Sequence, residues 1–167
     1  VNHSDFVSVE HSTLIGGIIL GQTRFPIIAH TPSTTKWYKV AVAVKDLGEM
    51  MIINAKSWWL IGRKCSTVSD LALKYNNANE KIGEHFSKIY EMNKKKYHIE
   101  PVITAVTSDW KHYTLYDGNH RGVYFYLNMH PNSKIQVLVG HTSDFTRQYQ
   151  GNFYCLHKYE PAWPFED

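Results

Sequence analysis

The chain has 167 residues, of which 43% are hydrophobic and 14% are aromatic. A chain of this length and composition can bury a core, which excludes an intrinsically disordered protein and favours a single domain over residues 1–167. The formal net charge of +3 at pH 7 suits an anionic partner, but it is too small for a protein that coats DNA.

The two cysteines, Cys65 and Cys155, stand far apart, and neither belongs to a Cys-x-x-Cys pair. This gives no support to a zinc-ribbon or thioredoxin-like motif, and it suits a reducing compartment. We therefore expect a cytoplasmic protein. The apolar runs are too short for a membrane-spanning helix, so we expect no membrane partner.

Residues 1–36 are expected to form an N-terminal extension to the core. Within it, residues 1–12 predict a loose or edge segment, and the apolar run at residues 14–20 predicts a buried strand. Residues 37–47 (WYKVAVAVKDL) follow, and their valines alternate with small residues. That pattern predicts a central strand buried on both faces.

The middle of the chain is less regular. Residues 50–53 and 58–61 are apolar enough for either a strand or a buried helix. A helix is expected next, capped by Ser66 or Thr67 and reaching Tyr75.

Residues 80–95 give the strongest helix signal, because apolar side chains recur on one face and lysines lie at the C-terminal end, where cations suit the helix dipole. Three β-rich runs then predict strands at residues 101–107, 113–116 and 135–139. Residues 140–167 form an aromatic C-terminal segment that is expected to wrap over the surface and to offer a contact to a protein partner. The mixed order of strands and helices predicts an α+β fold.

The densest cluster of chemically active residues is Asp117, Gly118, Asn119, His120 and Arg121. A strand-like run leads into it, and an aromatic run follows. Arg121 can fork onto a phosphate, the backbone N–H groups around Gly118 can form an anion-binding nest, and His120 can move protons near neutral pH. The cluster therefore predicts a phosphate or nucleotide site.

The same residues also allow a plainer interpretation. Asp-Gly between two β-rich runs is a strong signal for a tight hairpin turn. On that interpretation Asp117 and Gly118 supply the turn geometry, while His120 and Arg121 lie in solvent. Spacing alone does not separate the two interpretations.

Over residues 40–139 the order of parts resembles the ParB/sulfiredoxin-like superfamily. A strand (VAVAVKDL) comes first and a helix (GEHFSKIYEM) follows later; a strand (PVITAV), a turn and a strand (YTLY) then lead into DGNHR, a helix-length run and a closing strand (IQVLV). The resemblance implies a compact mixed sheet with flanking helices. It also implies that the signature ends a strand and opens a helix, so residues 122–129 are expected to be helical despite their β-type aromatic side chains.

Members of this superfamily bind nucleotides at this loop, and they include nucleotide-dependent switches, kinases, nucleases and sulfiredoxins. Sulfiredoxin-like signatures carry a cysteine where this chain has Asn119, so cysteine repair is not expected. Chromosome-partitioning members have a signature richer in arginine, of which only His120 and Arg121 remain, and this puts a CTP-switched DNA clamp in doubt. The DG-x-HR form is most similar to the kinase and ATPase/nuclease members, which include small plasmid- or phage-borne proteins of one domain.

Each residue of the signature has an expected role. Asp117 is the expected Mg²⁺ ligand or general base, and His120 is the expected phosphate contact or proton shuttle. Gly118, Asn119 and His120 are expected to bind phosphate together with Arg121. Asp117, His120 and Arg121 are the expected catalytic residues of the signature.

Kinase and nuclease members also need a second acidic group near an early strand. Asp46 and Glu49 follow the valine-rich run and are available for this role. Glu49 is the candidate catalytic residue of the two, although a solvated loop carboxylate is the plainer interpretation of either one.

We therefore expect a nucleotide-binding enzyme with ATPase activity, DNA-cleaving activity or both, which uses ATP or another nucleotide with Mg²⁺. DNA is a second expected partner. Two alternatives stay open. One is an ADP- or ATP-dependent small-molecule kinase on the same fold, and the other is a non-catalytic binding or inhibitor module.

Overall fold

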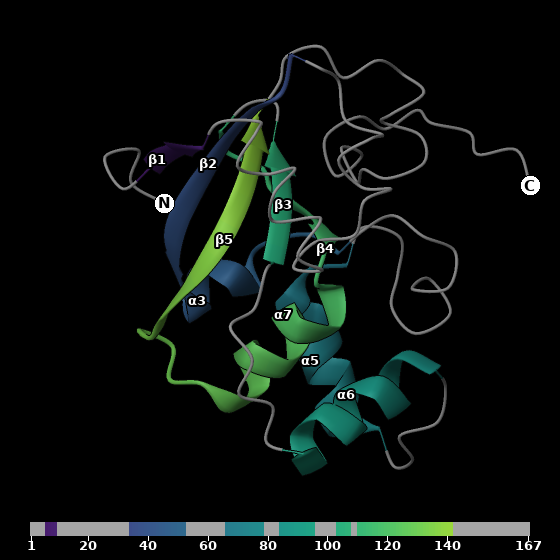
Figure 1. Cartoon of the computed structure of the whole chain (residues 1–167). Coiled ribbons are helices and arrows are strands. Elements are labelled where there is room, and N and C mark those ends of the chain that lie inside the picture. Colours follow the sequence, from purple (N-terminus) through teal and green to yellow (C-terminus); the bar gives the residue numbers. More distant parts are fainter. Residues whose placement is uncertain are drawn as a thin grey trace, which may run out of the picture.

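The computed structural model describes residues 6–9, 34–52, 66–78, 84–95, 103–107 and 110–141 (Figure 1). These residues form a five-stranded mixed sheet and four helices, which confirms the expected α+β class. The expected strand at residues 14–20, the apolar run at residues 58–61 and nearly all of the aromatic C-terminal segment lie outside the described residues.

The strands have the following bounds: β1 Phe6–Val9, β2 Lys36–Ala43, β3 Ile103–Thr107, β4 Thr114–Asp117 and β5 Lys134–His141. Their order across the sheet is β1-β2-β5-β3-β4. β3 runs parallel to β5, and the other neighbouring strands are antiparallel. The three strands predicted in the second half of the chain are confirmed, and β1 makes part of the N-terminal segment a strand that pairs with β2.

β2 is shorter than the strand predicted at residues 37–47. Strand pairing ends at Ala43, and the short helix α3 (Val44–Gly48) follows. The backbone N–H of Val44 donates a hydrogen bond to the Ser133 carbonyl oxygen at 2.9 Å. This bond to the loop before β5 turns the chain out of the sheet. The alternating valines that predict the strand do not predict this bond.

β2 is also not buried on both faces, so that part of the prediction is wrong. Val40 and Val42 point into the core and are buried. On the opposite face Trp37 is buried, Lys39 is exposed and Ala41 is half-buried. Burial therefore alternates along most of the strand, as it does when one face of a sheet carries the main core.

α5 (Val68–Asn77) begins at Thr67, one of the two predicted caps. Thr67 Oγ1 accepts a hydrogen bond from the Asp70 N–H at 3.2 Å, and Asp70 Oδ2 accepts one from the Thr67 N–H at 2.9 Å. This reciprocal pair is a capping box, which satisfies two N–H groups at the helix start. Met51, from the ambiguous run at residues 50–53, forms an isolated β-bridge with Thr67.

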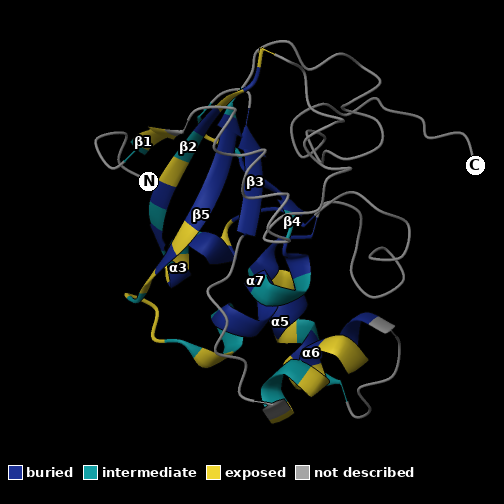
Figure 2. Cartoon of the chain, viewed as in Figure 1, coloured by how far each residue is buried: buried dark blue, intermediate teal, exposed yellow. Residues whose placement is uncertain are grey.

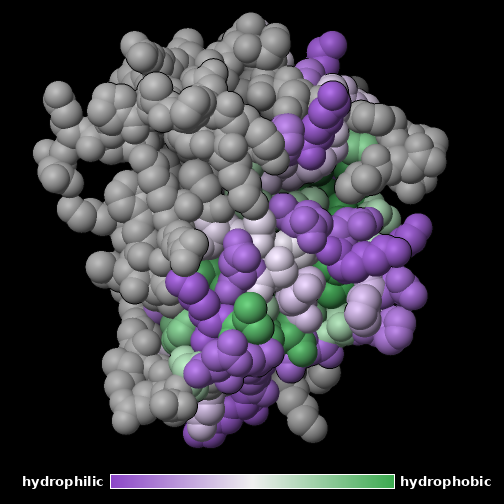
Figure 3. Space-filling model, turned by 180° about the vertical axis from the view of Figure 1, so that it is seen from behind, coloured by the Kyte–Doolittle hydropathy of each residue, from purple (hydrophilic) through white to green (hydrophobic). Residues whose placement is uncertain are grey.

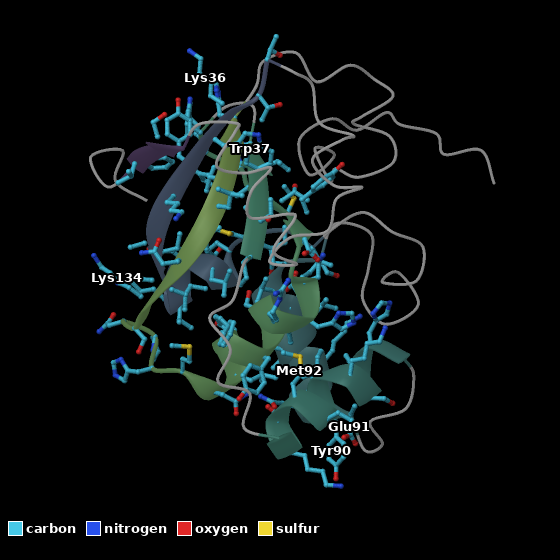
Figure 4. All side chains as sticks on the ribbon, viewed as in Figure 1. Lys36, Trp37, Tyr90, Glu91, Met92 and Lys134 are labelled. Carbon is cyan, nitrogen blue, oxygen red and sulfur yellow. The ribbon has the colours of Figure 1, made fainter. Side chains whose placement is uncertain are left out.

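α6 (Glu84–Lys95) confirms the predicted helix over its described length. Phe86 and Ile89 are buried, whereas Figure 4 shows Tyr90 and Glu91 pointing away from the rest of the structure. Apolar residues at this spacing give the helix one buried face and one solvated face.

A chain of polar side chains ties α5, α6 and α7 (Asn119–Asn128) together. Asn93 Nδ2 on α6 donates to Tyr75 Oη on α5 at 3.3 Å, and Asn128 Nδ2 on α7 donates to Asn93 Oδ1 at 2.7 Å. These two hydrogen bonds join α6 to both α5 and α7, and the three helices lie together below the sheet in Figure 1.

One hydrophobic core joins the helices to the sheet, and its residues appear dark blue in Figure 2. Both β4 and α7 contribute to it, through Leu115 and Val123, which are fully buried. The junction between β4 and α7 is therefore anchored on both sides by core packing. The other largest fully buried side chains are Leu47, Leu71, Ile89, Ile103, Val40, Val42, Val44, Val68, Val106 and Val137.

Replacement of the α5 cap tests the local account of this helix. Thr67→Ala removes the oxygen that accepts from Asp70, so we expect a loss of about 1 kcal/mol in the free energy of unfolding, measured by urea denaturation. Asn76→Ala, at the exposed end of the same helix, is the control and should change stability by less than about 0.5 kcal/mol. Equal effects of the two substitutions would contradict the capping box.

Candidate functional site

The DGNHR signature forms a strand-to-helix junction. β4 ends at Asp117, Gly118 is the N-cap residue with φ 81° and ψ 20°, and α7 begins at Asn119. The hairpin-turn interpretation is therefore wrong, and the expected helix at residues 122–129 is confirmed with an earlier start. α7 begins without a side-chain cap and without an acidic residue in its first turn.

Gly118 is required by both its backbone conformation and its surroundings. Its φ of 81° lies in the left-handed region, which other residues enter at a cost. A Cβ at this position would lie 3.1 Å from Ile103 Cγ1 and 3.2 Å from Ile103 Cα. Gly118 thus lets the chain reverse from strand to helix while it stays in close contact with β3.

α7 is helical although its sequence is rich in aromatic residues because it fits closely against the core. Val123, Tyr124 and Phe125 are buried. A Cβ on Gly122 would lie 2.8 Å from Leu115 Cδ1, so glycine lets the first turns of α7 approach β4. Tertiary packing of this kind overrides the β propensity of the aromatic side chains.

Arg121 folds back over the junction onto Asp117. Its Nη2 donates to Asp117 Oδ2 at 3.2 Å, and its Nε lies 3.3 Å from the position that a Cβ of Gly118 would occupy. The two side chains are 26% and 17% exposed, and a pair of this kind contributes about 0–1 kcal/mol to stability. Its main consequence is geometric, because it holds a guanidinium group at the N-terminus of α7.

His120 contacts a second histidine, His85, from the start of α6. His85 Nδ1 and His120 Nε2 lie 2.7 Å apart. The ring centres are 4.9 Å apart and the ring planes are inclined by 29°, so the nitrogen contact runs from ring edge to ring edge, as a hydrogen bond does. His85 is buried, whereas His120 is half-buried.

Sequence reasoning missed His85 as a site residue. Its position held a usable signal, because it lies four residues before Ile89 and three after Ile82, on the apolar face of the strongest predicted helix. A histidine on a buried face needs a polar partner. Which partner it meets depends on how α6 packs on α7, and no local pattern specifies that packing.

The remaining residues of the junction face inward. Asn119 is 7% exposed and is the first residue of α7, so its helical position excludes the alternative role of a left-handed turn residue. Thr104 lies opposite Asp117 in the pairing of β3 with β4, and its side chain is fully buried. Within the part of the chain that the structure describes, Thr104 Oγ1 has no hydrogen-bond partner.

Glu49 lies away from the start of α7. It is exposed and follows α3, where the neighbouring Gly48 packs directly against the Tyr126 ring. Tyr126 is about two helical turns beyond the N-terminus of α7. The structure brings Asp117 and Arg121 into contact, with His120 in the same first turn of α7, but it places Glu49 beside the later part of α7. Asp46 lies within α3 and is half-buried.

Asp117 is the carboxylate of the junction. Among residues 6–9, 34–52, 66–78, 84–95, 103–107 and 110–141, no group of three or more His, Cys, Asp or Glu side chains is arranged to hold a metal ion. Asp117 alone therefore fits a Mg²⁺ ion only if phosphate oxygens and water complete the coordination, as is common for this metal. In the same ranges no helix combines the length and the apolar character that crossing a membrane requires.

Exposed lysines are spread over the described surface. Lys36 and Lys134 lie near opposite ends of the sheet in Figure 4. Lys45 belongs to α3, and Lys88 and Lys94 belong to α6. Over the coloured part of the rear face in Figure 3, hydrophilic side chains predominate, with hydrophobic side chains in small patches between them. A spread of this kind does not single out one path for a nucleic-acid backbone.

Comparison of the chain with protein-family models, with curated proteins and with solved structures finds no match. The chemistry of the β4–α7 junction and the resemblance of its signature are therefore the two features that bear on the function of the protein.

Two substitutions at Gly118 separate two contributions to the free energy of unfolding. One is the cost of a left-handed backbone for a residue with a side chain, and the other is the cost of placing a Cβ against Ile103. Gly118→Ala should lower the free energy of unfolding by about 1–2 kcal/mol or more in urea denaturation, because alanine resists the left-handed region. Gly118→Asn adds the same Cβ, but asparagine tolerates this region better, so its loss should be smaller. A larger loss for Gly118→Asn would contradict the conformational argument.

Proposed function

We propose that the β4–α7 junction binds the phosphate groups of a nucleotide and that the protein hydrolyses a phosphoanhydride or phosphodiester bond there. The observation that supports this most strongly is the position of the Arg121 guanidinium and the His120 imidazole in the first turn of an uncapped helix. The N-terminus of such a helix attracts anions through its N–H groups and its dipole.

Each group at the junction has a task in phosphate binding. The bond to Asp117 uses one of the five N–H donors of Arg121, and the other donors can reach phosphate oxygens. The left-handed backbone at Gly118 carries no Cβ, so a phosphate can approach the peptide N–H groups that follow.

Hydrolysis follows from the acid and base groups at the same place. His120 can give a proton to the leaving oxygen, and the Asp117 carboxylate can orient and deprotonate the attacking water. Arg121 stabilises the negative charge that spreads over the phosphoryl oxygens in the transition state. Bound Mg²⁺ would neutralise phosphate charge. Asp117 has one oxygen, Oδ1, that does not accept from Arg121, so this carboxylate would either help to hold the ion through Oδ1 or take the proton of the attacking water there.

Membership of the ParB/sulfiredoxin-like superfamily is part of the proposal. The observed order of strand, DGNHR signature, helix and closing strand supports this part of the proposal, because the resemblance implies the same order. The position of Glu49 gives no support to its role as a second catalytic acid. The spread of exposed lysines favours a nucleotide over DNA as the first substrate to test, with ATP as the first nucleotide and DNA as the second substrate.

Nucleotide binding should raise the thermal stability of the protein. At 100 times its dissociation constant, ATP with Mg²⁺ should stabilise the wild-type protein by roughly 2.7 kcal/mol. Arg121→Ala should lose most of this effect, whereas Arg121→Lys should keep part of it because a point charge remains.

The matched control for this experiment is Lys134→Ala, which removes an exposed cation from β5 at a distance from the junction in Figure 4. It should behave as the wild type does. If ATP, ADP, CTP and GTP all leave the melting temperature of the wild-type protein unchanged, the junction is not a nucleotide site, and a non-catalytic role with a macromolecular partner becomes the better account.

Release of inorganic phosphate from ATP should depend on the acid and base groups. We expect His120→Ala and Asp117→Asn each to lower kcat by about 10² or more, because each removes one proton-transfer group. Unchanged turnover in both variants would contradict these roles. If the phosphoryl group passes to a hydroxyl acceptor and not to water, the protein is a kinase of the same fold.

A further inference from the structure

The ion pair between Asp117 and Arg121 acts on an anionic ligand in two opposite ways. Arg121 Nη2 donates to Asp117 Oδ2 at 3.2 Å, and both side chains are partly exposed to solvent. The guanidinium group is the cation that would bind a phosphate, whereas the carboxylate beside it carries a charge that repels one. The two charges cancel in the absence of a ligand, so the pair offers an incoming anion no net attraction.

The start of α7 shows that Asp117 is the group that opposes a phosphate at the junction. Gly118 caps the helix without a side-chain hydrogen bond, and the first turn has no acidic residue. The helix N–H groups and the helix dipole therefore attract anions there. Asp117, the last residue of β4, is the one acidic residue of the DGNHR signature.

Asp117 opposes a free phosphate, but it favours a phosphate that carries a divalent cation. Within the described residues no set of three His, Cys, Asp or Glu side chains is arranged to hold a metal ion, so Asp117 belongs to no preformed metal site there. In phosphate-binding proteins one or two carboxylates hold Mg²⁺ together with phosphate oxygens. Asp117 therefore suits a cation that arrives with the phosphate groups.

We propose that Asp117 and Arg121 exchange partners when the ligand binds, and that this exchange selects nucleoside di- and triphosphates in complex with a divalent cation. Arg121 turns from the carboxylate to a phosphate oxygen, and Asp117 turns from the guanidinium to the cation. The inference rests on the proposed function of the junction, because it names the class of ligand and the regulation of that same site.

The exchange favours phosphoanhydrides over phosphate diesters. Adjacent phosphate groups hold one cation between their oxygens, as the β- and γ-phosphates of ATP do in phosphoryl-transfer enzymes. A nucleoside monophosphate and a DNA backbone present their phosphate groups singly, so they bring a cation to Asp117 less firmly. The junction should therefore bind ADP and ATP more tightly than AMP or DNA.

The exchange also leaves the carboxylate able to serve in hydrolysis. In the ligand-free protein Asp117 Oδ2 accepts from Arg121. Once Arg121 has turned to the phosphate, Oδ2 is released. Asp117 can then meet the cation with one oxygen and the attacking water with the other.

Isothermal titration calorimetry with ADP tests the exchange through binding alone. The wild-type protein should bind ADP about fivefold or more tightly in excess Mg²⁺ than in EDTA, which is the lower end of ordinary coupling between two ligands. In excess Mg²⁺ it should also bind ADP more tightly than AMP. Equal affinities for ADP and AMP would overturn the assigned class of ligand.

Asp117→Asn removes the charge and keeps the shape of the side chain. It should bind metal-free ADP about fivefold or more tightly than the wild type does, and its preference for the Mg²⁺ complex should disappear or reverse, because metal-free ADP carries more negative charge. Glu91→Gln is the matched control, since it removes one exposed carboxylate that points away from the rest of the structure in Figure 4. It should keep the wild-type affinities.

The outcomes separate this inference from the proposed function. If the wild type binds ADP equally well with and without Mg²⁺, or if Asp117→Asn keeps the wild-type preference, the exchange of partners is wrong although the junction still binds a nucleotide. The wild-type comparison decides this even if Asp117→Asn does not fold. If neither ADP nor ATP binds to the wild type in either condition, the proposed function fails and the exchange fails with it.

Discussion

The left-handed backbone at Gly118 is the constraint on which the candidate site depends. It allows β4 to end and α7 to begin within one residue, in direct contact with Ile103 of the neighbouring strand. Because the helix starts there, Arg121 lies close enough to return to Asp117, and His120 faces α6. A residue with a side chain at position 118 would disturb the conformation, the contact with β3 and the place of the guanidinium together.

Packing around the junction supplies the rigidity that a binding site needs. Leu115 holds β4 in the core, and Val123 holds α7 against it. On the other side, α6 is fastened to α7 at two points, through His85 with His120 near their starts and through Asn93 with Asn128 near their ends. The polar groups of the junction therefore belong to a strand and helices that the core packing fixes in position. Functional groups on rigid elements of this kind keep a constant geometry.

Much of this fold could be predicted from local patterns in the sequence. The capping signal at Thr67, the helix that includes Phe86 and Ile89, and the three later strands were all predictable, because each depends on neighbouring residues. The helix after DGNHR required the order of elements over the whole segment, since its aromatic side chains favour a strand. The end of β2 at Ala43 was not predictable, because it depends on hydrogen bonds to a loop nearly one hundred residues later.

The residues of the candidate site also differ in whether the sequence alone can identify them. Asp117, His120 and Arg121 lie within five consecutive residues and form a visible cluster in the sequence, whereas Glu49 is a candidate only through the resemblance and lies beside the later part of α7. His85 was missed because its contact with His120 spans thirty-five residues and exists only through the packing of two helices. Charge and hydrogen-bond chemistry can be assigned to a local motif, but the groups that tune it come from the tertiary structure.

The most direct test is an NMR titration that follows the backbone N–H groups while inorganic phosphate, and then ATP, is added to the protein. If the β4–α7 junction binds phosphate, the N–H signals of Gly118, Asn119, His120 and Arg121 should shift first and saturate together, with smaller changes at His85. Saturating shifts confined to another part of the chain, or no shifts with either anion, would contradict the claim that the β4–α7 junction is a phosphate site.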